Sequence, residues 1–210
     1  VTSLGFRVEE PTAETVATLL KGIDLKAVEV NFTSCPRKAV ELARVLVAYL
    51  KENGAEKDFH GSIDFNPFKR ALKHETEFPG DITAMSCELL DTVKEVPALR
   101  VLSVDSNVLS NAGAYIYQEL GYALAWGSQW MTMLTEAGRC ADEVASRVKF
   151  NMGVSSNFFM ELAKFRAARM MWAQIAEQYK PESKDSCKMM AHAVTSRFNQ
   201  TLYDAHVNLL

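Results

Sequence analysis

Short apolar segments alternate with helical segments along the whole sequence, and this alternation limits the possible folds more than any other feature. Each helical segment has apolar residues at every third or fourth position, whereas the short segments are rich in residues that favour strands. A strand followed by a covering helix pairs in parallel with the next strand, since the helix returns the chain to the same edge of the sheet. The predicted strands are residues 2–8, 27–33, 60–68, 99–106, 147–156 and 188–196.

The predicted helices lie between these strands. Pro11 can open the first helix, and Asn53 with Gly54 is a typical end for the second. The polar residues 74–81 are expected to form a connector. The predicted helices are residues 11–23, 36–53, 82–93, 112–125 and 153–180, with further short helices up to residue 144.

The segment 153–180 is the longest predicted helix and is expected to be buried. Asn157 or one of the two serines before it can cap its start, and Pro181 marks its end. Arg169 falls within the apolar stripe, where its charge is costly without a partner, so we expect an ion pair with a neighbouring helix. The predicted buried stripe consists of Phe158, Leu162, Phe165, Trp172, Ala176 and Tyr179.

Two architectures fit a parallel sheet covered by helices. A doubly wound sheet often carries a glycine-rich phosphate loop after its first strand, but residues 4–12 contain one glycine and no such motif. A (β/α)8 barrel of the TIM type is the alternative, and six strand–helix units are two short of a closed barrel. Since the sequence also begins at Val1 and ends in an apolar run, we expect a fragment of about six β-α units.

In a barrel, the residues at the carboxyl ends of the strands face the functional site. Polar side chains of this sequence occur at the predicted end of every strand but the first. The candidates for the site are Asn31, Thr33, Asp64, Asn66, Asp105, Asn107, Asn151 and residues 192–196.

The composition argues against nucleic-acid or membrane binding through charge. The sequence has 23 Lys and Arg against 26 Asp and Glu, which leaves a net charge of -3 and no basic run. Four widely separated cysteines lack a CxxC pair, so we expect buried, reduced thiols and neither zinc nor a disulfide framework. Without a signal peptide or an apolar run long enough for a bilayer, the expected location is cytoplasmic.

Three segments resemble the barrel domain of the cobalamin-dependent acyl-CoA mutases, the methylmalonyl-CoA mutase family. They are NFFMELAKFRAARMMWA (157–173), HAVTSRFNQTLYDAHVN (192–208) and AGAYIYQELGYALA (112–125). The resemblance implies a (β/α)8 barrel threaded by the pantetheine arm of acyl-CoA, and a separate Rossmann-like domain that carries cobalamin. The reaction that it implies is the radical interconversion of methylmalonyl-CoA and succinyl-CoA.

The sequence departs from the family at positions that the resemblance implies are catalytic. Where catalytic relatives carry Gly-Tyr-His, this sequence has Ser106, Asn107 and Val108. Asp64 and His74 stand where the family places a glutamine and an arginine on the thioester and the substrate carboxylate. A carboxylate at Asp64 would repel an anionic acyl-CoA, and an imidazole is a poor replacement for a bidentate guanidinium. We therefore expect no catalytic residues and at most weak binding of acyl-CoA.

Three residues remain as vestigial substrate contacts implied by the resemblance: Arg147, His192 and Thr195. Arg147 matches a family arginine that contacts coenzyme A, with an ordinary ion pair as the alternative. The family's His-Ser-Gln-Thr-Ser segment becomes His192-Ala-Val-Thr195-Ser here, so the histidine has lost its glutamine neighbour. A hydrogen-bonded histidine in the barrel interior is therefore the favoured interpretation of His192.

We expect no cofactor and no metal on this chain. The family's cobalt-ligating motif is Asp-x-His-x-x-Gly, and neither Asp58-Phe59-His60 nor Asp204-Ala205-His206 completes it. Residues 1–210 are accordingly expected to form the partial barrel without the cobalamin-binding domain. Adenosylcobalamin would then be bound elsewhere in the holoenzyme.

The resemblance and the departures together favour a noncatalytic small subunit of a heterodimeric mutase. Its expected partner is the catalytic large subunit, with no nucleic acid and no membrane involved. Two alternatives remain open. The first is an active cobalamin-dependent mutase of altered acyl-CoA specificity, and the second is a stand-alone barrel enzyme that shares only the fold.

Overall fold

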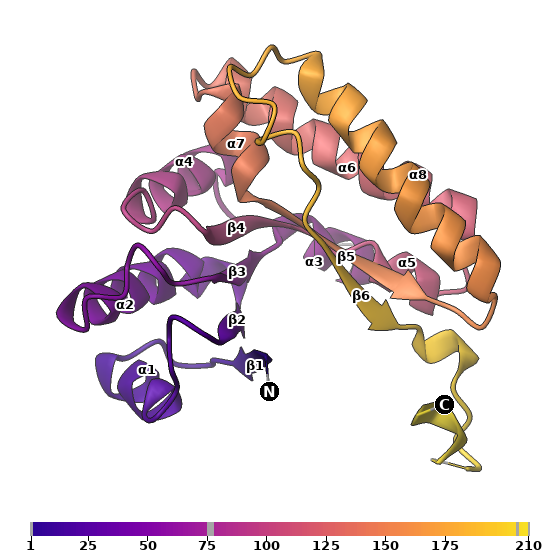
Figure 1. Ribbon diagram of the computed structural model, residues 1–210, viewed down its shortest axis with the longest axis horizontal. Helices are drawn as coiled ribbons and strands as arrows, with labels where there is room; N and C mark the ends of the chain where they lie inside the picture. The colour runs from indigo at the N-terminus through magenta and orange to yellow at the C-terminus, as the bar shows by residue number, and fades with distance from the viewer. Residues whose placement is uncertain (1, 75–77, 205, 210) are drawn as a thin grey trace. The chain divides into compact units, whose positions relative to one another are not determined.

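The computed structural model describes residues 2–74, 78–204 and 206–209 (Figure 1). The chain divides into two compact units. Unit one comprises Val1–Ser103 and Glu136–Arg139, and unit two comprises Val104–Thr135 and Cys140–Leu210. Parallel strands alternate with helices in both units. The predicted fold class, a partial (β/α)8 barrel of six strand–helix units, is confirmed.

Unit one is a parallel sheet with helices in its connections. β1 pairs with β2, β2 with β3 and β3 with β4, so strands that are neighbours in the chain are neighbours in the sheet. This order is typical of a barrel, whereas a doubly wound sheet reverses its strand order. The elements are β1 (Ser3–Arg7), α1 (Ala13–Leu20), β2 (Glu29–Thr33), η1 (Pro36–Lys38), α2 (Ala39–Glu52), β3 (Gly61–Phe65), α3 (Pro67–His74), α4 (Ile82–Thr92) and β4 (Leu99–Val104), whose last residue belongs to unit two.

Aliphatic side chains form the buried face of α2. Leu42, Leu46 and Leu50 recur at helical spacing and are fully buried. Beside this helix, β2 and β3 approach so closely that a Cβ atom at Gly61 would lie 2.0 Å from the carbonyl oxygen of Val30. Only glycine fits at this position of β3.

Unit two contains a second pair of parallel strands and the two longest helices. β5 and β6 pair from Phe150 opposite Ala191 to Val154 opposite Thr195. α6 and α8 run side by side in Figure 1. The elements are α5 (Asn107–Asn111), α6 (Ile116–Glu136, its last residue in unit one), α7 (Ala141–Arg147), β5 (Val148–Val154), α8 (Phe158–Glu177), β6 (Ala191–Thr195), η2 (Arg197–Asn199) and η3 (Val207–Leu209).

Aromatic side chains fill the space between β5, α6 and α8. The rings of Phe150 and Trp172 meet edge to face with their centroids 4.9 Å apart. A Cβ atom at Gly127 of α6 would lie 2.6 Å from the Trp172 ring and 2.8 Å from the Phe150 ring. The absence of a side chain at Gly127 therefore allows α6 to pack directly on this aromatic pair.

All six predicted strands are present, and two α-helices, α3 and α5, were not predicted. α3 begins at Pro67, inside the segment that the sequence predicts to be strand. Asn66 Oδ1 accepts a hydrogen bond from the Lys69 N–H at 2.9 Å, so an N-cap followed by a proline starts the helix. α6 also starts and ends later than predicted, at Ile116 and Glu136. Within the described residues, no helix is long and apolar enough to cross a membrane.

The predicted buried stripe of α8 is only partly correct. Trp172 and Ala176 are buried, but Phe158 is 70% exposed and Leu162 is 49% exposed. α8 instead buries Glu161, Lys164, Ala168, Trp172 and Ala176, a face rotated from the one that apolar residues alone indicate. Arg169 is exposed, and its Nε donates to the Phe165 carbonyl oxygen of its own helix at 3.3 Å. The expected ion pair of Arg169 does not occur among the described residues.

The four cysteines are free, as expected, but only Cys187 is buried. Burial raises the pKa of the Cys187 thiol. Cys35 and Cys140 are exposed, at the N-cap positions of the short helices η1 and α7 respectively. The prediction of buried thiols is therefore wrong for these two residues.

Candidate functional site

Polar side chains of unit one form a chain of hydrogen bonds across three strands. Asn31 Nδ2 donates to Ser3 Oγ at 3.1 Å, and Ser62 Oγ donates to Asn31 Oδ1 at 2.7 Å. Since side chains alternate along a strand, Asn31 lies on the face of β2 opposite to the fully buried Phe32. On this face the polar groups of neighbouring strands bind one another.

Asp64 lies at the end of this chain of hydrogen bonds, near the carboxyl end of β3. Its two carboxylate oxygens accept from Ser62 Oγ at 3.3 Å and from Thr33 Oγ1 at 3.4 Å. The structure thus brings together the predicted site residues Asn31, Thr33 and Asp64. Asn66 caps α3 instead, and the side chain of His74 lies outside the described residues.

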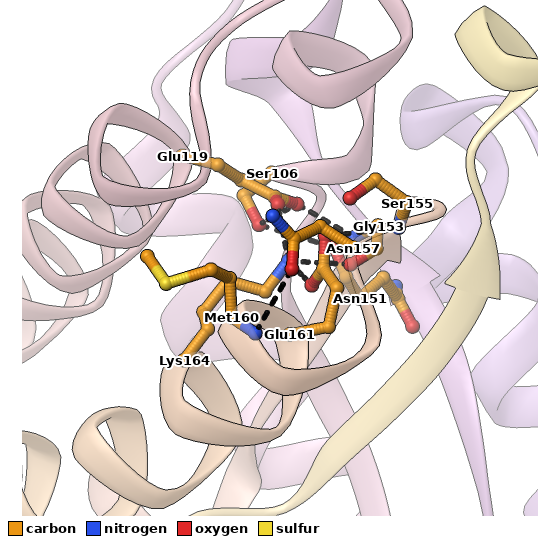
Figure 2. A network of polar contacts seen from close by, with 9 residues as sticks. All are labelled: Ser106, Glu119, Asn151, Gly153, Ser155, Asn157, Met160, Glu161 and Lys164. Carbon is orange, nitrogen blue, oxygen red and sulfur yellow. Dashed lines mark hydrogen bonds and ion pairs between the residues drawn. The ribbon is translucent and has the colours of Figure 1, made fainter.

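Figure 2 shows a network of polar contacts in unit two that includes the buried ammonium group of Lys164. Lys164 Nζ on α8 lies 2.7 Å from Glu119 Oε2 on α6 and 2.5 Å from Glu161 Oε2 one turn earlier on α8. It also donates to the Gly153 carbonyl oxygen of β5 at 2.5 Å. The three charged side chains are at most 5% exposed. One lysine therefore joins two helices and a strand.

Backbone and hydroxyl donors add to the partners of the two carboxylates. Glu119 Oε1 accepts from the Gly153 N–H at 2.6 Å and from Ser106 Oγ at 3.2 Å. Glu161 Oε1 accepts from the Ser155 N–H at 2.9 Å. Buried charges are tolerated only with partners of this kind, because moving an unpaired carboxylate from water into the protein interior costs roughly several kcal/mol. We name Glu119, Glu161 and Lys164 the charged cluster.

Two predicted site residues meet beside the charged cluster. Asn151 Nδ2 donates to Asp105 Oδ1 at 2.6 Å, and both residues are buried. The carbonyl oxygen of Asn151 accepts from Ser106 Oγ at 3.3 Å, which links this pair to the cluster. Asn107, the remaining candidate of this region, is the first residue of α5.

The three predicted substrate contacts do not form one group. Arg147 ends α7 and is buried, whereas Thr195 ends β6, opposite Val154, and is exposed. A strand advances about 3.3 Å per residue, so the chain from Arg147 to Val154 spans roughly 20 Å. His192 lies opposite Asn151 and is exposed, and its imidazole ring makes no hydrogen bond among the described residues. This differs from the hydrogen-bonded interior position that the sequence favours.

Sequence reasoning missed the charged cluster, although part of its signal is visible. Glu161 and Lys164 are three residues apart and therefore share one face of α8. Both lie within a strongly apolar segment, where a pair of opposite charges indicates a buried ion pair. Glu119 is on another helix, and only the tertiary fold brings its carboxylate to Lys164.

In neither incomplete cobalt motif does the aspartate carboxylate contact the histidine ring. Asp58 Oδ2 lies 3.0 Å from Lys26 Nζ, and His60 Nδ1 contacts the carbonyl oxygen of Asp58 at 2.8 Å. Asp204 Oδ1 accepts from the backbone N–H of His206 at 3.0 Å, which is a local turn. The described part of the chain also has no group of three or more His, Cys, Asp or Glu that could hold a metal ion.

Asp142 anchors the loop that leads from α8 to β6. Its carboxylate accepts from Ser186 Oγ at 2.5 Å and from the N–H groups of Glu182 and Ser183 at 2.7 and 2.9 Å. These hydrogen bonds lower the pKa of Asp142. The bond from Ser186 has the largest effect, and the two backbone bonds have smaller ones. The carboxylate is therefore charged at neutral pH and holds the loop in place.

Residues 3–210 match the family described as methylmalonyl-CoA mutase. The chain is similar to the methylmalonyl-CoA mutase small subunit of Porphyromonas gingivalis, with 48% identity over 214 residues, 100% of this chain and 34% of the relative. It is 30% identical over 203 residues to the methylmalonyl-CoA mutase of Rhizobium meliloti, which covers 95% of this chain and 28% of the relative.

A mitochondrial relative agrees with these matches. The chain is 29% identical over 203 residues to the mitochondrial methylmalonyl-CoA mutase of Homo sapiens, covering 95% of this chain and 27% of the relative. The chain thus spans about a third or less of the length of the curated relatives that it matches. By the family match over nearly its whole length, the chain belongs to the methylmalonyl-CoA mutase family.

Proposed function

We propose that this chain is part of the noncatalytic small subunit of a heterodimeric methylmalonyl-CoA mutase. In this role it packs against a catalytic large subunit that interconverts methylmalonyl-CoA and succinyl-CoA. Similarity to a small subunit over the whole chain supports the subunit assignment. The assembly would be an isomerase, and the residues described above would stabilise it without contacting the reacting atoms.

The proposal depends on the contacts and positions of residues 106–108, which stand where the resemblance expects Gly-Tyr-His. Ser106 is fully buried, and its hydroxyl binds Glu119 and the Asn151 carbonyl oxygen. Asn107 and Val108 form the start of α5. Val108 has no polar atom in its side chain and cannot hold or transfer a proton. The contacts of Ser106 with the charged cluster support a structural role for this segment.

Unit one supports the same conclusion through Asp64. A mutase needs hydrogen-bond donors for the acyl thioester and carboxylate, whereas Asp64 offers acceptors that Ser62 and Thr33 already contact. Loss of one well-placed donor costs on the order of a hundredfold to a thousandfold in rate. With several donors replaced together, we expect no measurable turnover from this chain.

We also propose that these residues hold no cobalamin. Adenosylcobalamin supplies the radical chemistry of the family when it is bound, and its cobalt would need a histidine oriented by a carboxylate. The Asp58 carboxylate pairs with Lys26 and does not orient His60. In the proposed assembly, the large subunit carries the cofactor.

Substitutions in each subunit of the purified heterodimer test this division of roles. His192→Ala and Thr195→Val in this chain should leave kcat for methylmalonyl-CoA unchanged. Removal of the histidine in the partner's Asp-x-His-x-x-Gly motif should abolish turnover in the same assay. Size-exclusion chromatography of each variant checks that the heterodimer remains assembled.

Calorimetric titration of methylmalonyl-CoA into the small subunit without its partner provides an independent measurement. The proposal expects no saturable heat. Stoichiometric micromolar binding, or a loss of turnover in an assembled His192→Ala heterodimer, would contradict the noncatalytic role. Either result would favour an active mutase of altered acyl-CoA specificity.

A further inference from the structure

The two long helices of unit two run side by side in the same direction (Figure 1). Near their starts, Lys164 Nζ on α8 contacts Glu119 Oε2 on α6, and these residues are 45 positions apart in the chain. Further along, the Tyr179 hydroxyl contacts Thr132 Oγ1 at 2.7 Å, and these residues are 47 positions apart. Because this offset is nearly constant, each residue of α6 lies beside a known residue of α8.

The sides of α6 and α8 that point away from the protein interior form one surface. On each helix, exposed residues recur at spacings of three, four and seven, which places them on one side of the helix. We name this surface the outer face, and it consists of Tyr122, Ala125 and Gln129 of α6 with Phe159, Arg166 and Met170 of α8.

The outer face has the composition of a protein interface. Tyr122, Phe159 and Met170 are 62%, 78% and 63% exposed, and Arg166 carries the only charge of the six residues. A helix face in water usually carries many charged residues. The core of an interface is instead rich in aromatic residues, Met and Arg, and poor in Lys, Glu and Asp. This composition indicates a surface that another protein covers.

The charge around the outer face indicates the chemistry of that protein. The segments that lead into the two helices, residues 106–118 and 153–160, contain no charged residue. The acidic residues in the first turns of the helices, Glu119 and Glu161, are buried in the charged cluster. Arg166 is exposed and forms no ion pair among the described residues. A partner that buries Arg166 must therefore supply a carboxylate, because a buried unpaired charge is strongly destabilising.

A second copy of this chain does not meet that requirement. In a two-fold contact the same face meets itself, so each copy would offer the guanidinium group of Arg166 and no carboxylate from the outer face. The nearest exposed acidic residue of α8 is Glu177, about three turns beyond Arg166. A different chain with an apolar and acidic surface is the better match.

We propose that the outer face binds the catalytic large subunit of the heterodimer. The large subunit contributes an apolar surface that packs against Tyr122 and Phe159, and a carboxylate that pairs with Arg166. This inference rests on the proposed function, because it assigns a surface of this chain to the partner that the proposed function requires.

The dissociation constant between the purified full-length subunits tests this surface. Arg166→Glu should raise Kd about a hundredfold, because a carboxylate then faces the carboxylate of the partner. Tyr122→Ala should raise Kd about tenfold or more, as is usual for an aromatic residue in the core of an interface. Arg37→Glu, at an exposed arginine of unit one, changes the net charge equally and should leave Kd unchanged.

The outcomes separate this inference from the proposed function. Circular dichroism and thermal unfolding of Arg166→Glu and Tyr122→Ala should match the unmodified small subunit, since both side chains are exposed. A heterodimer whose Kd is unaffected by both substitutions would overturn this inference and leave the proposed function standing. If the unmodified subunits do not associate at all, the proposed function fails as well.

Two other occupants of the outer face would also overturn the inference. Self-association of the small subunit that Arg166→Glu abolishes, measured by analytical ultracentrifugation, would assign the outer face to a second copy. Binding of the small subunit to phosphatidylserine vesicles that Arg166→Glu abolishes would assign the outer face to a membrane surface.

Discussion

The helices α2 and α8 cover their units in opposite ways. The buried face of α2 is aliphatic and includes Leu42, Leu46 and Leu50. α8 buries a glutamate and a lysine near its start, while Phe158 and Phe159 at the same end are exposed. The periodicity of apolar residues therefore identifies the inner face of α2 and misidentifies that of the first turns of α8.

The difference teaches that the two faces depend on different forces. Burial of leucine is non-directional, so another apolar side chain of similar volume can replace it at a cost below about 1.5 kcal/mol. The charged cluster is directional, because each buried charge requires its partner at hydrogen-bond distance. We expect the buried face of α2 to tolerate substitutions that preserve size, and the charged part of the buried face of α8 to tolerate only those that preserve the balance of charge.

The largest expected effect is the loss of the cluster's cation. Lys164→Met leaves Glu119 and Glu161 buried without a counter-charge and should destabilise the protein by about 3–5 kcal/mol. Urea unfolding followed by circular dichroism measures this change. Arg169→Met on the exposed face of α8 is the matched control and should stay within about 0.5 kcal/mol.

Removal of all three charges sharpens the same test. The triple variant Lys164→Met, Glu119→Gln, Glu161→Gln should recover part of the stability that Lys164→Met loses, because no unpaired buried charge remains. A cost below about 1 kcal/mol for Lys164→Met alone would mean that the cluster does not determine the inner face of α8.

The next largest expected effect is a loss of about 3 kcal/mol in the free energy of unfolding when the buried face of α2 is truncated. Leu46→Ala removes buried methyl groups and leaves a cavity, for which losses of about 2–5 kcal/mol are usual. Leu46→Met should cost less than about 1.5 kcal/mol in the same denaturation measurement. If Leu46→Met were as damaging as Leu46→Ala, the packing of α2 would be as specific as that of α8.

A smaller effect is expected where α6 approaches α8. Gly127→Ala places a methyl group within 2.6 Å of Trp172 and 2.8 Å of Phe150, so the aromatic pair must shift. Overpacking of this kind costs about 1–3 kcal/mol. Thermal unfolding should show the loss, and Gly121→Ala, with nothing within 4 Å of the added Cβ atom, is the control on the same helix.

The smallest effect contrasts an exposed ion pair with the buried one. Hydrogen bonds from Arg139 lower the pKa of Asp91 below its usual value of 3.8. Because the pKa is lower in the folded state, the pair stabilises the protein above that value and the contribution disappears as the pH falls through the folded-state pKa. With the Asp91 side chain 63% exposed, Asp91→Asn should cost at most about 1 kcal/mol at pH 7.

Urea denaturation at a series of pH values measures this contribution. The stability difference between Asp91→Asn and the unmodified protein should shrink once Asp91 is protonated. A difference that stays constant down to about pH 2 would show that the charge of Asp91 is not its source.

Much of the fold can be predicted from the sequence because strands and helices differ in period and length. The six strands are short apolar runs between helices, and the parallel pairing follows from the connections. α3 is missed, since its start depends on the Asn66 side chain, which caps a helix here but could equally end a strand. The inner face of α8 is missed because apolar residues occupy nearly every side of its first turns.

The candidate site was predictable where it depends on strand ends alone. Asn31 and Ser62 meet because they are opposite each other on the neighbouring parallel strands β2 and β3, whereas Asp105 follows the end of β4 and accepts from Asn151 within β5. The charged cluster depends on the approach of α6 to α8, which no local pattern encodes. The separation of Arg147 from Thr195 likewise follows from their positions at opposite ends of β5 and β6.

The close packing of aromatic side chains in unit two also determines what the intrinsic tryptophan fluorescence of this protein measures. All three tryptophans, Trp126, Trp130 and Trp172, are buried in unit two, and unit one has none. Their fluorescence emission shifts to the red when water reaches the indole rings, so it follows the opening of unit two alone. A tryptophan in place of the half-buried Tyr49 on α2 would give unit one an emission signal of its own.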